Sequence, residues 1–152
     1  LVGSEMCIRD RYERDSWIVF TENKKQAKEF NKIVNKLKGF NSGIYNTDLN
    51  DDERQENLEK FKAGNLNVLV SCTALDEGFD MPEADGAMIL SASSSKRQRI
   101  QRMGRVLRIT ANKENALIVT VYSSKTEYEK LREESNRYKL EGVPVKWQQM
   151  SL

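Results

Sequence analysis

One stretch of the sequence concentrates basic side chains with no acid to balance them. Seven Lys and Arg residues fall between Gly86 and Lys113, and no Asp or Glu falls there. The whole chain carries a net charge of only +2, so the rest of it is net acidic. A solvated basic face is the simplest interpretation of such a run. Guanidinium groups also bind phosphates, because their fork of N–H donors matches phosphate oxygens.

Helical spacing divides this basic stretch into two faces. At about 100° per residue, three apolar side chains share one stripe: Ile100, Met103 and Leu107. Gln101, Arg105 and Arg108 fall within about 60° of one another on the opposite side. Gly104 lies beside them, although glycine costs about 1 kcal/mol of helix propensity. Two guanidiniums on one face repel unless an anion lies between them, so we expect this face to bind a polyphosphate.

Missing residue types exclude several kinds of site. The chain has no histidine, which excludes a Ser-His-Asp triad and any histidine metal site. Only Cys7 and Cys72 are present, so there is neither a disulfide framework nor a zinc ribbon. We therefore expect no metal site in this chain. No apolar run approaches the ~20 residues that span a bilayer, so we expect no membrane partner and a cytoplasmic location.

Strand and helix patterns alternate along the chain and must position these groups. Short runs of β-forming residues predict five strands, at 17–20, 43–45, 68–71, 87–90 and 117–121, with a last edge strand at 143–147. Such alternation is typical of an α/β fold, with a parallel sheet of about five to six strands and helices on both faces. Ligands of such sheets bind at the C-terminal ends of the strands.

Four helices are expected between and after these strands. The first is capped within 21–23 and ends near Gly39, with five inward-facing residues: Ala27, Phe30, Ile33, Val34 and Leu37. The second begins with a capping box at 50–53, turns Leu58 and Phe61 inward, and ends at Gly64. The third runs from Ser94 or Ser95 to about Leu107, and the fourth covers 127–138.

Four stretches, in the right order, resemble motifs of superfamily 2 helicases. Residues 101–108 resemble motif VI, Q-R-x-G-R-x-x-R, and residues 68–82 resemble motif V. Residues 17–21 resemble motif IV, and 54–64 resemble the helix and turn that usually follow it. The first residue of motif VI and its Val-Leu pair are closer to transcription-repair and restriction-type translocases than to DEAD-box RNA helicases. The resemblance covers about residues 15 to 125.

The resemblance implies a RecA-like second motor domain, P-loop NTPase-like but without a phosphate loop of its own. In that family ATP with Mg²⁺ lies between two RecA-like domains, held mainly by the first domain. Arg105 and Arg108 would be the arginine fingers, and Gln101 would organise the γ-phosphate or the attacking water. Three more residues would lie at the ATP cleft: Gly78, Asp80 and Arg102.

The same resemblance implies contacts to a nucleic-acid backbone. Thr73 would contact a phosphate through its hydroxyl and backbone N–H, and Thr21 would lie near the strand. Phosphate contacts of this kind position a strand without reading its sequence. The expected partners are therefore nucleic acid, with DNA preferred, and the first RecA-like domain of the same protein.

Simpler structural roles compete with several of these assignments. Asp80 would cap a turn before Pro82, Thr73 would form an ST-turn at a strand end, and Arg102 would be structural. We interpret Arg54 as the surface ion-pair partner of Asp51, three residues earlier on the same helix. We interpret three residues as core residues before any binding role: Trp17, Phe20 and Cys72.

The sequence contains no G-x-x-x-x-G-K-[ST] phosphate loop. We therefore expect the C-terminal motor half of an ATP-dependent helicase or translocase, inactive in ATP hydrolysis by itself. The alternative is a non-catalytic module of the same fold that binds nucleic acid or a partner protein. A flavodoxin-like or cofactor enzyme is disfavoured, because no glycine-rich turn follows the first strand.

The N-terminal residues differ in character from the rest. Leu1 to Asp10 resembles the in-frame translation of a transposase-type sequencing adapter, and Arg11 is compatible with it. We therefore expect residues 1–11 to be an adapter-derived or disordered tail, and residues 12–152 to form a helicase C-terminal RecA-like domain cut from a longer protein.

Overall fold

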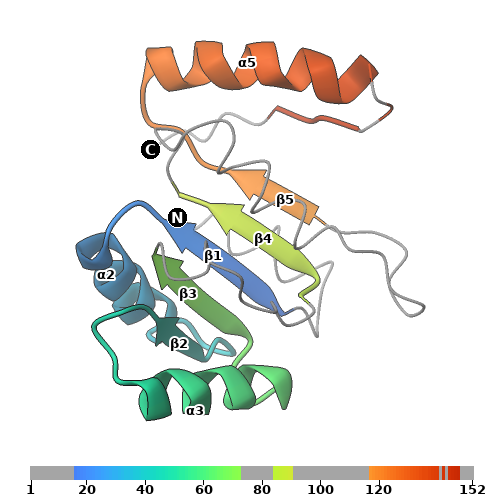
Figure 1. The fold of residues 1–152 in the computed structure, drawn as a ribbon. Coiled ribbons are helices and arrows are strands. Elements are labelled where there is room, and N and C mark those ends of the chain that lie inside the picture. The colour runs from blue at the N-terminus through green and yellow to red at the C-terminus, as the bar shows by residue number, and fades with distance from the viewer. Residues whose placement is uncertain (1–15, 73–83, 91–116, 141, 143, 148–152) are drawn as a thin grey trace. The chain divides into compact units, whose positions relative to one another are not determined.

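The computed structural model describes residues 16–72, 84–90, 117–140, 142 and 144–147 (Figure 1). The chain divides into two compact units, Asp15–Val121 and Tyr122–Leu152 together with Leu1–Arg14. The first unit holds the sheet, and the second holds the last helix. The boundary expected at residue 12 stays a prediction.

The first unit is built on a five-stranded sheet. Its strands are β1 (Trp17–Thr21), β2 (Ser42–Tyr45), β3 (Val68–Cys72), β4 (Gly86–Ile89) and β5 (Leu117–Thr120). Their order is β2-β3-β1-β4-β5, and every neighbouring pair is parallel (Figure 1). All five strands therefore end at one edge, which we call the carboxyl edge. The predicted parallel α/β sheet is confirmed, with the strands within one or two residues of the expected positions.

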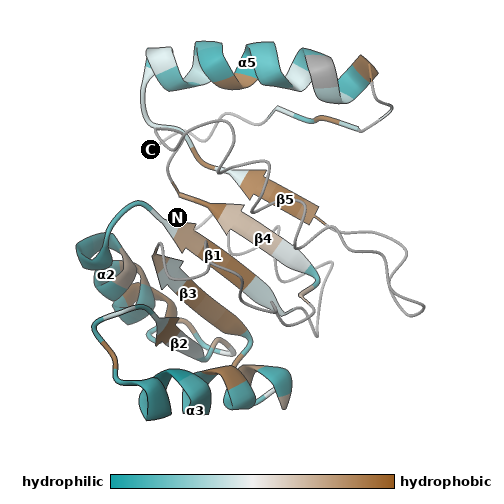
Figure 2. Ribbon diagram, in the orientation of Figure 1, coloured by the Kyte–Doolittle hydropathy of each residue, from teal (hydrophilic) through white to brown (hydrophobic). Residues whose placement is uncertain are grey.

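Two helices cover opposite faces of this sheet. Side chains alternate between the faces along each strand. On one face α2 (Lys24–Val34) buries Ala27 and Val34 against the odd-numbered residues of β1. On the other face α3 (Asp51–Lys62) buries Leu58 and Phe61 against the even-numbered ones. Apolar strands between largely polar helices are the pattern of Figure 2 and of a sheet buried on both sides.

The first helix ends earlier than its apolar spacing predicts. Helix α2 stops at Val34, and Asn35 is its C-cap. The Leu37 N–H bonds the Val34 carbonyl at 2.9 Å, so Leu37 belongs to a tighter turn beyond the helix. Ile33, expected to face inward, is 45% exposed. Gly39 has a φ of +89°, so the residue expected at the helix end lies in the left-handed region, but one turn further on.

The predicted capping box of the second helix is confirmed. The Asn50 Oδ1 accepts from the Glu53 N–H at 2.8 Å, and the Asn50 N–H donates to Glu53 Oε2 at 3.2 Å. The first turn also carries Asp51 and Asp52, which favour the positive end of the helix dipole. Gly64, with a φ of +77°, follows the C-cap as expected.

Replacing Asn50 with alanine is expected to lower the free energy of unfolding by about 1 kcal/mol. The substitution removes the acceptor for the Glu53 N–H and leaves a helix-end donor without its side-chain partner. Urea denaturation followed by circular dichroism measures this change. Asn65→Ala, in the turn after α3, is the matched control, and an equal loss in both variants would contradict the assignment.

The remaining predicted elements have mixed outcomes. The helix expected at 94–107 lies outside the described residues. The last helix, α5 (Lys125–Leu140), extends beyond the predicted 127–138 at both ends. Residues 144–147 form no strand, so the expected edge strand is wrong for the described part of 143–147. Trp147 instead packs its ring edge-on against Tyr128, with centroids 5.3 Å apart, and Tyr122 completes the aromatic cluster.

A local carboxylate cap fixes the start of α5. Glu127 Oε2 accepts from the backbone N–H groups of Ser123 and Ser124, at 2.8 and 3.2 Å. These donors, above all the Ser123 N–H, hold the pKa of Glu127 below its ordinary 4.5. Neither α5 nor any other described helix has the length and apolarity that crossing a bilayer requires.

Candidate nucleic-acid interface at the carboxyl edge

The carboxyl edge is where the chain segments with the predicted site residues leave the sheet. Residue 73 directly follows the last residue of β3. After β4, the Leu90 N–H still donates to the Phe20 carbonyl of β1, and residue 91 is the next in the chain. Strand β1 lies between β3 and β4. The connections that contain the segments resembling motifs V and VI therefore begin at the same edge of the sheet, on the two sides of β1.

Most predicted site residues lie outside the described residues: Thr73, Gly78, Asp80, Gln101, Arg102, Arg105 and Arg108. Their assigned roles stay predictions. Thr21 is the one member of the set that the structure describes.

Thr21 is committed to the fold rather than exposed at the edge. Its side chain is buried, with a residue exposure of 1%. The hydroxyl lies 3.2 Å from the Ser71 carbonyl and 3.3 Å from the Asn23 carbonyl, and its single proton serves these two acceptors. The hydroxyl thus joins β1 to β3 and to the start of α2. The hydroxyl is therefore occupied within the fold, and the expectation that Thr21 lies near a nucleic-acid strand stays a prediction.

The connection from β1 to α2 is closed by its own side chains. It consists of two residues, Glu22 and Asn23. The Gln26 N–H donates to Asn23 Oδ1 at 2.9 Å, and the Glu22 N–H donates to Gln26 Oε1 at 2.8 Å. A phosphate loop would present free backbone N–H groups at this position. In this chain the N–H groups of Glu22 and Gln26 are instead bonded to side chains of the same connection and helix.

Sequence reasoning missed an ion-pair cluster beside this connection. One oxygen of Asp48 lies 2.5 Å from Lys24 Nζ, and the other lies 2.9 Å from Lys28 Nζ. Lys24, and then Lys28, hold the pKa of the exposed Asp48 carboxyl below its ordinary 3.8. Asp48 lies three residues beyond β2, so the cluster joins the loop after β2 to the first turns of α2.

Asn46 positions this loop. It follows β2 and is fully buried, with 0% exposure. Its Oδ1 accepts from the Asp48 N–H at 3.0 Å, and its carbonyl accepts from the Leu49 N–H at 3.3 Å. This Asx-turn geometry holds Asp48 in place next to α2. The turn residues Asn46, Thr47 and Asp48 were the available signal in the sequence, and their link to α2 was not visible there.

One acidic side chain, that of Asp85, lies at the other edge of the sheet. Asp85 lies at the amino end of β4, where its Oδ2 accepts from the Ser16 N–H at 2.8 Å and from the Ser16 hydroxyl at 3.0 Å. It ties the beginnings of β1 and β4 together, at the edge opposite the carboxyl edge. The described residues contain no group of three or more His, Cys, Asp or Glu that would hold a metal ion.

The simpler assignments made from sequence are confirmed where the structure describes them. Arg54 pairs with Asp51 on the surface of α3. Trp17, Phe20 and Cys72 are buried in the core, with exposures of 5%, 3% and 3%.

Comparisons with known proteins assign this chain to a protein family. The family model of the helicase conserved C-terminal domain matches residues 4–110. The chain belongs to this family. The helicase C-terminal domain match begins inside the segment that resembles an adapter, so the tail boundary near residue 11 remains an expectation.

Individual relatives agree with the superfamily 2 assignment. The chain is 35% identical over 121 residues to the DNA 3'-5' translocase XPB2 of Sulfurisphaera tokodaii, which covers 80% of the chain and 26% of that relative. It is 30% identical over 107 residues to the ATP-dependent rRNA helicase RRP3 of Kluyveromyces lactis, covering 70% of the chain and 22% of the relative. The chain thus spans about a quarter of the length of these two relatives.

Solved structures show the same fold. The C-terminal domain of the DEAD-box protein Dbp5 superposes with a TM-score of 0.66 at 22% identity, covering 91% of this chain and 79% of that one. The helicase domain of Pyrococcus furiosus Hef gives a TM-score of 0.62 at 22% identity, covering 88% and 27%. The helicase C-terminal domain described here therefore has the RecA-like fold that the motifs predicted.

Proposed function

We propose that this domain is the C-terminal motor half of an ATP-dependent nucleic-acid helicase or translocase. One observation carries the proposal: the connections that contain the segments resembling motifs V and VI begin at the carboxyl edge, after β3 and β4, the two strands that flank β1. Ligands of parallel sheets bind at this edge, near the point where connections diverge. Family membership supports the same reading.

In the proposed motor, ATP and Mg²⁺ are held mainly by a first RecA-like domain. Arg105 and Arg108 stabilise the charge that develops on the γ-phosphate, and Gln101 orients the γ-phosphate or water. Gly78, Asp80 and Arg102 line the cleft. The connection between β1 and α2 supports this division of labour, because the N–H groups of Glu22 and Gln26 are already bonded to side chains of the chain itself.

The proposed track is DNA, and Thr73 contacts its backbone phosphate. The greater identity and coverage of the DNA translocase, compared with the rRNA helicase, support DNA over RNA. The proposed partners are thus DNA and the first motor domain, in a cytoplasmic protein.

Comparing this chain with the complete protein tests the proposal. We expect the chain alone to show no ATP turnover with or without DNA, and the complete protein to show DNA-stimulated turnover. The reason is that each half supplies only part of the catalytic set. The assay measures phosphate release after expression from the coding sequence extended upstream of residue 12. Turnover by the chain alone would contradict the proposal. DNA binding without any turnover by the complete protein would instead favour a non-catalytic binding module.

A further inference from the structure

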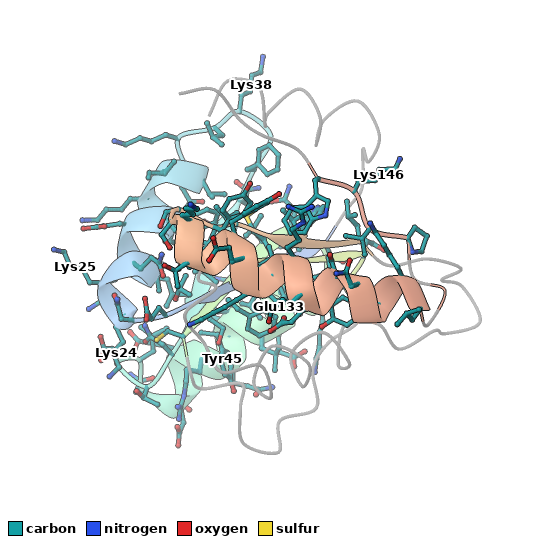
Figure 3. All side chains as sticks on the ribbon, turned by 90° about the horizontal axis from the view of Figure 1, so that it is seen from above. Lys24, Lys25, Lys38, Tyr45, Glu133 and Lys146 are labelled. Atoms are coloured by element: carbon teal, nitrogen blue, oxygen red, sulfur yellow. The ribbon has the colours of Figure 1, made fainter. Side chains whose placement is uncertain are left out.

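Strand β2 is the last strand on one side of the sheet and pairs with β3 over all four of its residues. An edge strand offers unpaired backbone N–H and C=O groups to any second strand, and proteins usually block such an edge with Lys, Pro or a bulge. The sequence of β2, Ser-Gly-Ile-Tyr, contains neither Lys nor Pro. Lys38, in the turn before β2, projects outward (Figure 3). The residues of the strand itself therefore leave its outer edge unprotected.

Hydrogen bonding to β3 shows which backbone groups of β2 face outward. The carbonyl of Asn41, one residue before β2, accepts from the Val68 N–H of β3 at 3.1 Å. Backbone groups point to alternate sides along a strand. The N–H and C=O groups of Ser42 and Ile44 therefore face away from β3, which gives the outer edge four hydrogen-bonding groups.

The side-chain amide of Asn35 occupies both outward groups of Ser42. Asn35 is the C-cap of α2. Its Oδ1 accepts from the Ser42 N–H at 2.8 Å, and its Nδ2 donates to the Ser42 carbonyl at 3.1 Å. An asparagine side chain carries a carbonyl and an N–H donor, as a peptide unit does. Asn35 therefore takes the place that a residue of a neighbouring strand would occupy.

A second amide, from α3, occupies the carbonyl of Ile44. The Asn57 Nδ2 donates to this carbonyl at 2.9 Å. Gly43 makes room for the amide, because a Cβ at position 43 would lie 3.3 Å from the Asn57 side chain and 2.6 Å from Leu66 Cδ1. The two asparagines reach the edge from helices on opposite faces of the sheet. Of the four outward groups, the Ile44 N–H is the one without a partner among the described residues.

We propose that Asn35 and Asn57 act as strand mimics that keep the β2 edge closed to the β2 edge of a second copy of this chain. Pairing between identical edges is the association that edge protection prevents. A twofold axis at Gly43 would place Ser42 of each copy opposite Ile44 of the other, so that each outward N–H meets an outward carbonyl. Two sheets joined in this way would become one continuous sheet. The two amides prevent this by occupying the groups first.

The double variant Asn35→Ala with Asn57→Ala, in the 152-residue chain, tests this closure. We expect it to self-associate about tenfold more tightly than the unaltered chain in sedimentation equilibrium, because three backbone groups become free to bond between copies. Asn65→Ala, which removes an exposed amide from the turn after α3, should change association less than about twofold. Asn35→Asp keeps an acceptor for the Ser42 N–H and adds charge to the edge, so it should give no gain.

Amide hydrogen exchange at Ile44 distinguishes pairing of this edge from general stickiness. Its N–H faces outward, so exchange in the double variant should slow about tenfold as protein concentration rises. A loss of stability would instead speed exchange throughout the sheet. Should the double variant fail to fold, Asn57→Ala alone carries the same two measurements.

Three results would overturn the proposal. They are association no tighter than in the unaltered chain, association without slower exchange at Ile44, and equal gains for Asn35→Asp and the alanine variants. The last result would mean that loss of stability, rather than an opened edge, causes the association. None of these measurements involves ATP, so the proposed function is judged separately, by turnover in the complete protein.

Discussion

Replacing Arg105 or Arg108 with alanine in the complete protein is expected to lower the kcat of ATP hydrolysis by about 10³-fold to 10⁵-fold. A guanidinium that meets the γ-phosphate acts mainly on the transition state, where negative charge develops. The KM for ATP should change much less, because in the proposed motor the first motor domain holds most of the nucleotide. Steady-state phosphate release at saturating DNA measures both quantities.

Arg99→Ala is the matched control for the two finger variants. Arg99 belongs to the same basic stretch but lies outside the part that resembles motif VI. Its loss should change kcat by less than about threefold, because it lies outside the segment to which the finger role is assigned. Lysine at position 105 should rescue little, since an ammonium cannot reproduce the planar fork. A loss below about tenfold for both Arg105→Ala and Arg108→Ala would contradict the finger assignment.

The structure shows where in the sheet the stretches that contain these arginines and Thr73 begin, although the arginines themselves lie outside the described residues. The basic stretch follows β4 at the carboxyl edge, and the stretch with Thr73 and Asp80 follows β3. Because β1 separates these two strands, both stretches begin within two strand spacings of each other. Asp85, which precedes β4, is instead bonded to Ser16 at the opposite edge.

Local signals explain why so much of the fold was predictable. The apolar run 17–20 is continuous because β1 is central and buried on both faces. The Asn50–Glu53 capping box and Gly64 mark helix ends through contacts within a few residues. Such short-range chemistry is readable from sequence alone.

The failures involve partners that are distant in sequence. Ile33 and Leu37 continued the helical spacing, but the turn at 35–40 ends α2 because Asn35 bonds Ser42 through both its amide oxygen and nitrogen. The bond from the Thr21 hydroxyl to the carbonyl of Ser71, in a neighbouring strand, was likewise not visible in the sequence. Asp48 and Lys24 are separated by 24 residues, so only the fold brings them together.

The second prediction of large effect concerns the stability of the core. The same isoleucine-to-alanine substitution is made at a buried position and at an exposed one. Ile18→Ala, in the middle of β1, should lower the free energy of unfolding by about 2–5 kcal/mol. Ile18 is 0% exposed and packs in the cluster that includes Leu58 and Phe61 from α3. Truncation leaves a cavity there, because the strand is paired on both sides and cannot collapse into it.

Ile33→Ala is the control with identical chemistry. Ile33 lies on α2 and is 45% exposed, so its truncation removes little buried surface, and alanine is the better helix former. We expect a change of less than about 1 kcal/mol. Urea denaturation measures both variants, and an unchanged m-value would show that the two-state comparison holds. Similar losses at both positions would mean that Ile33 is covered in solution.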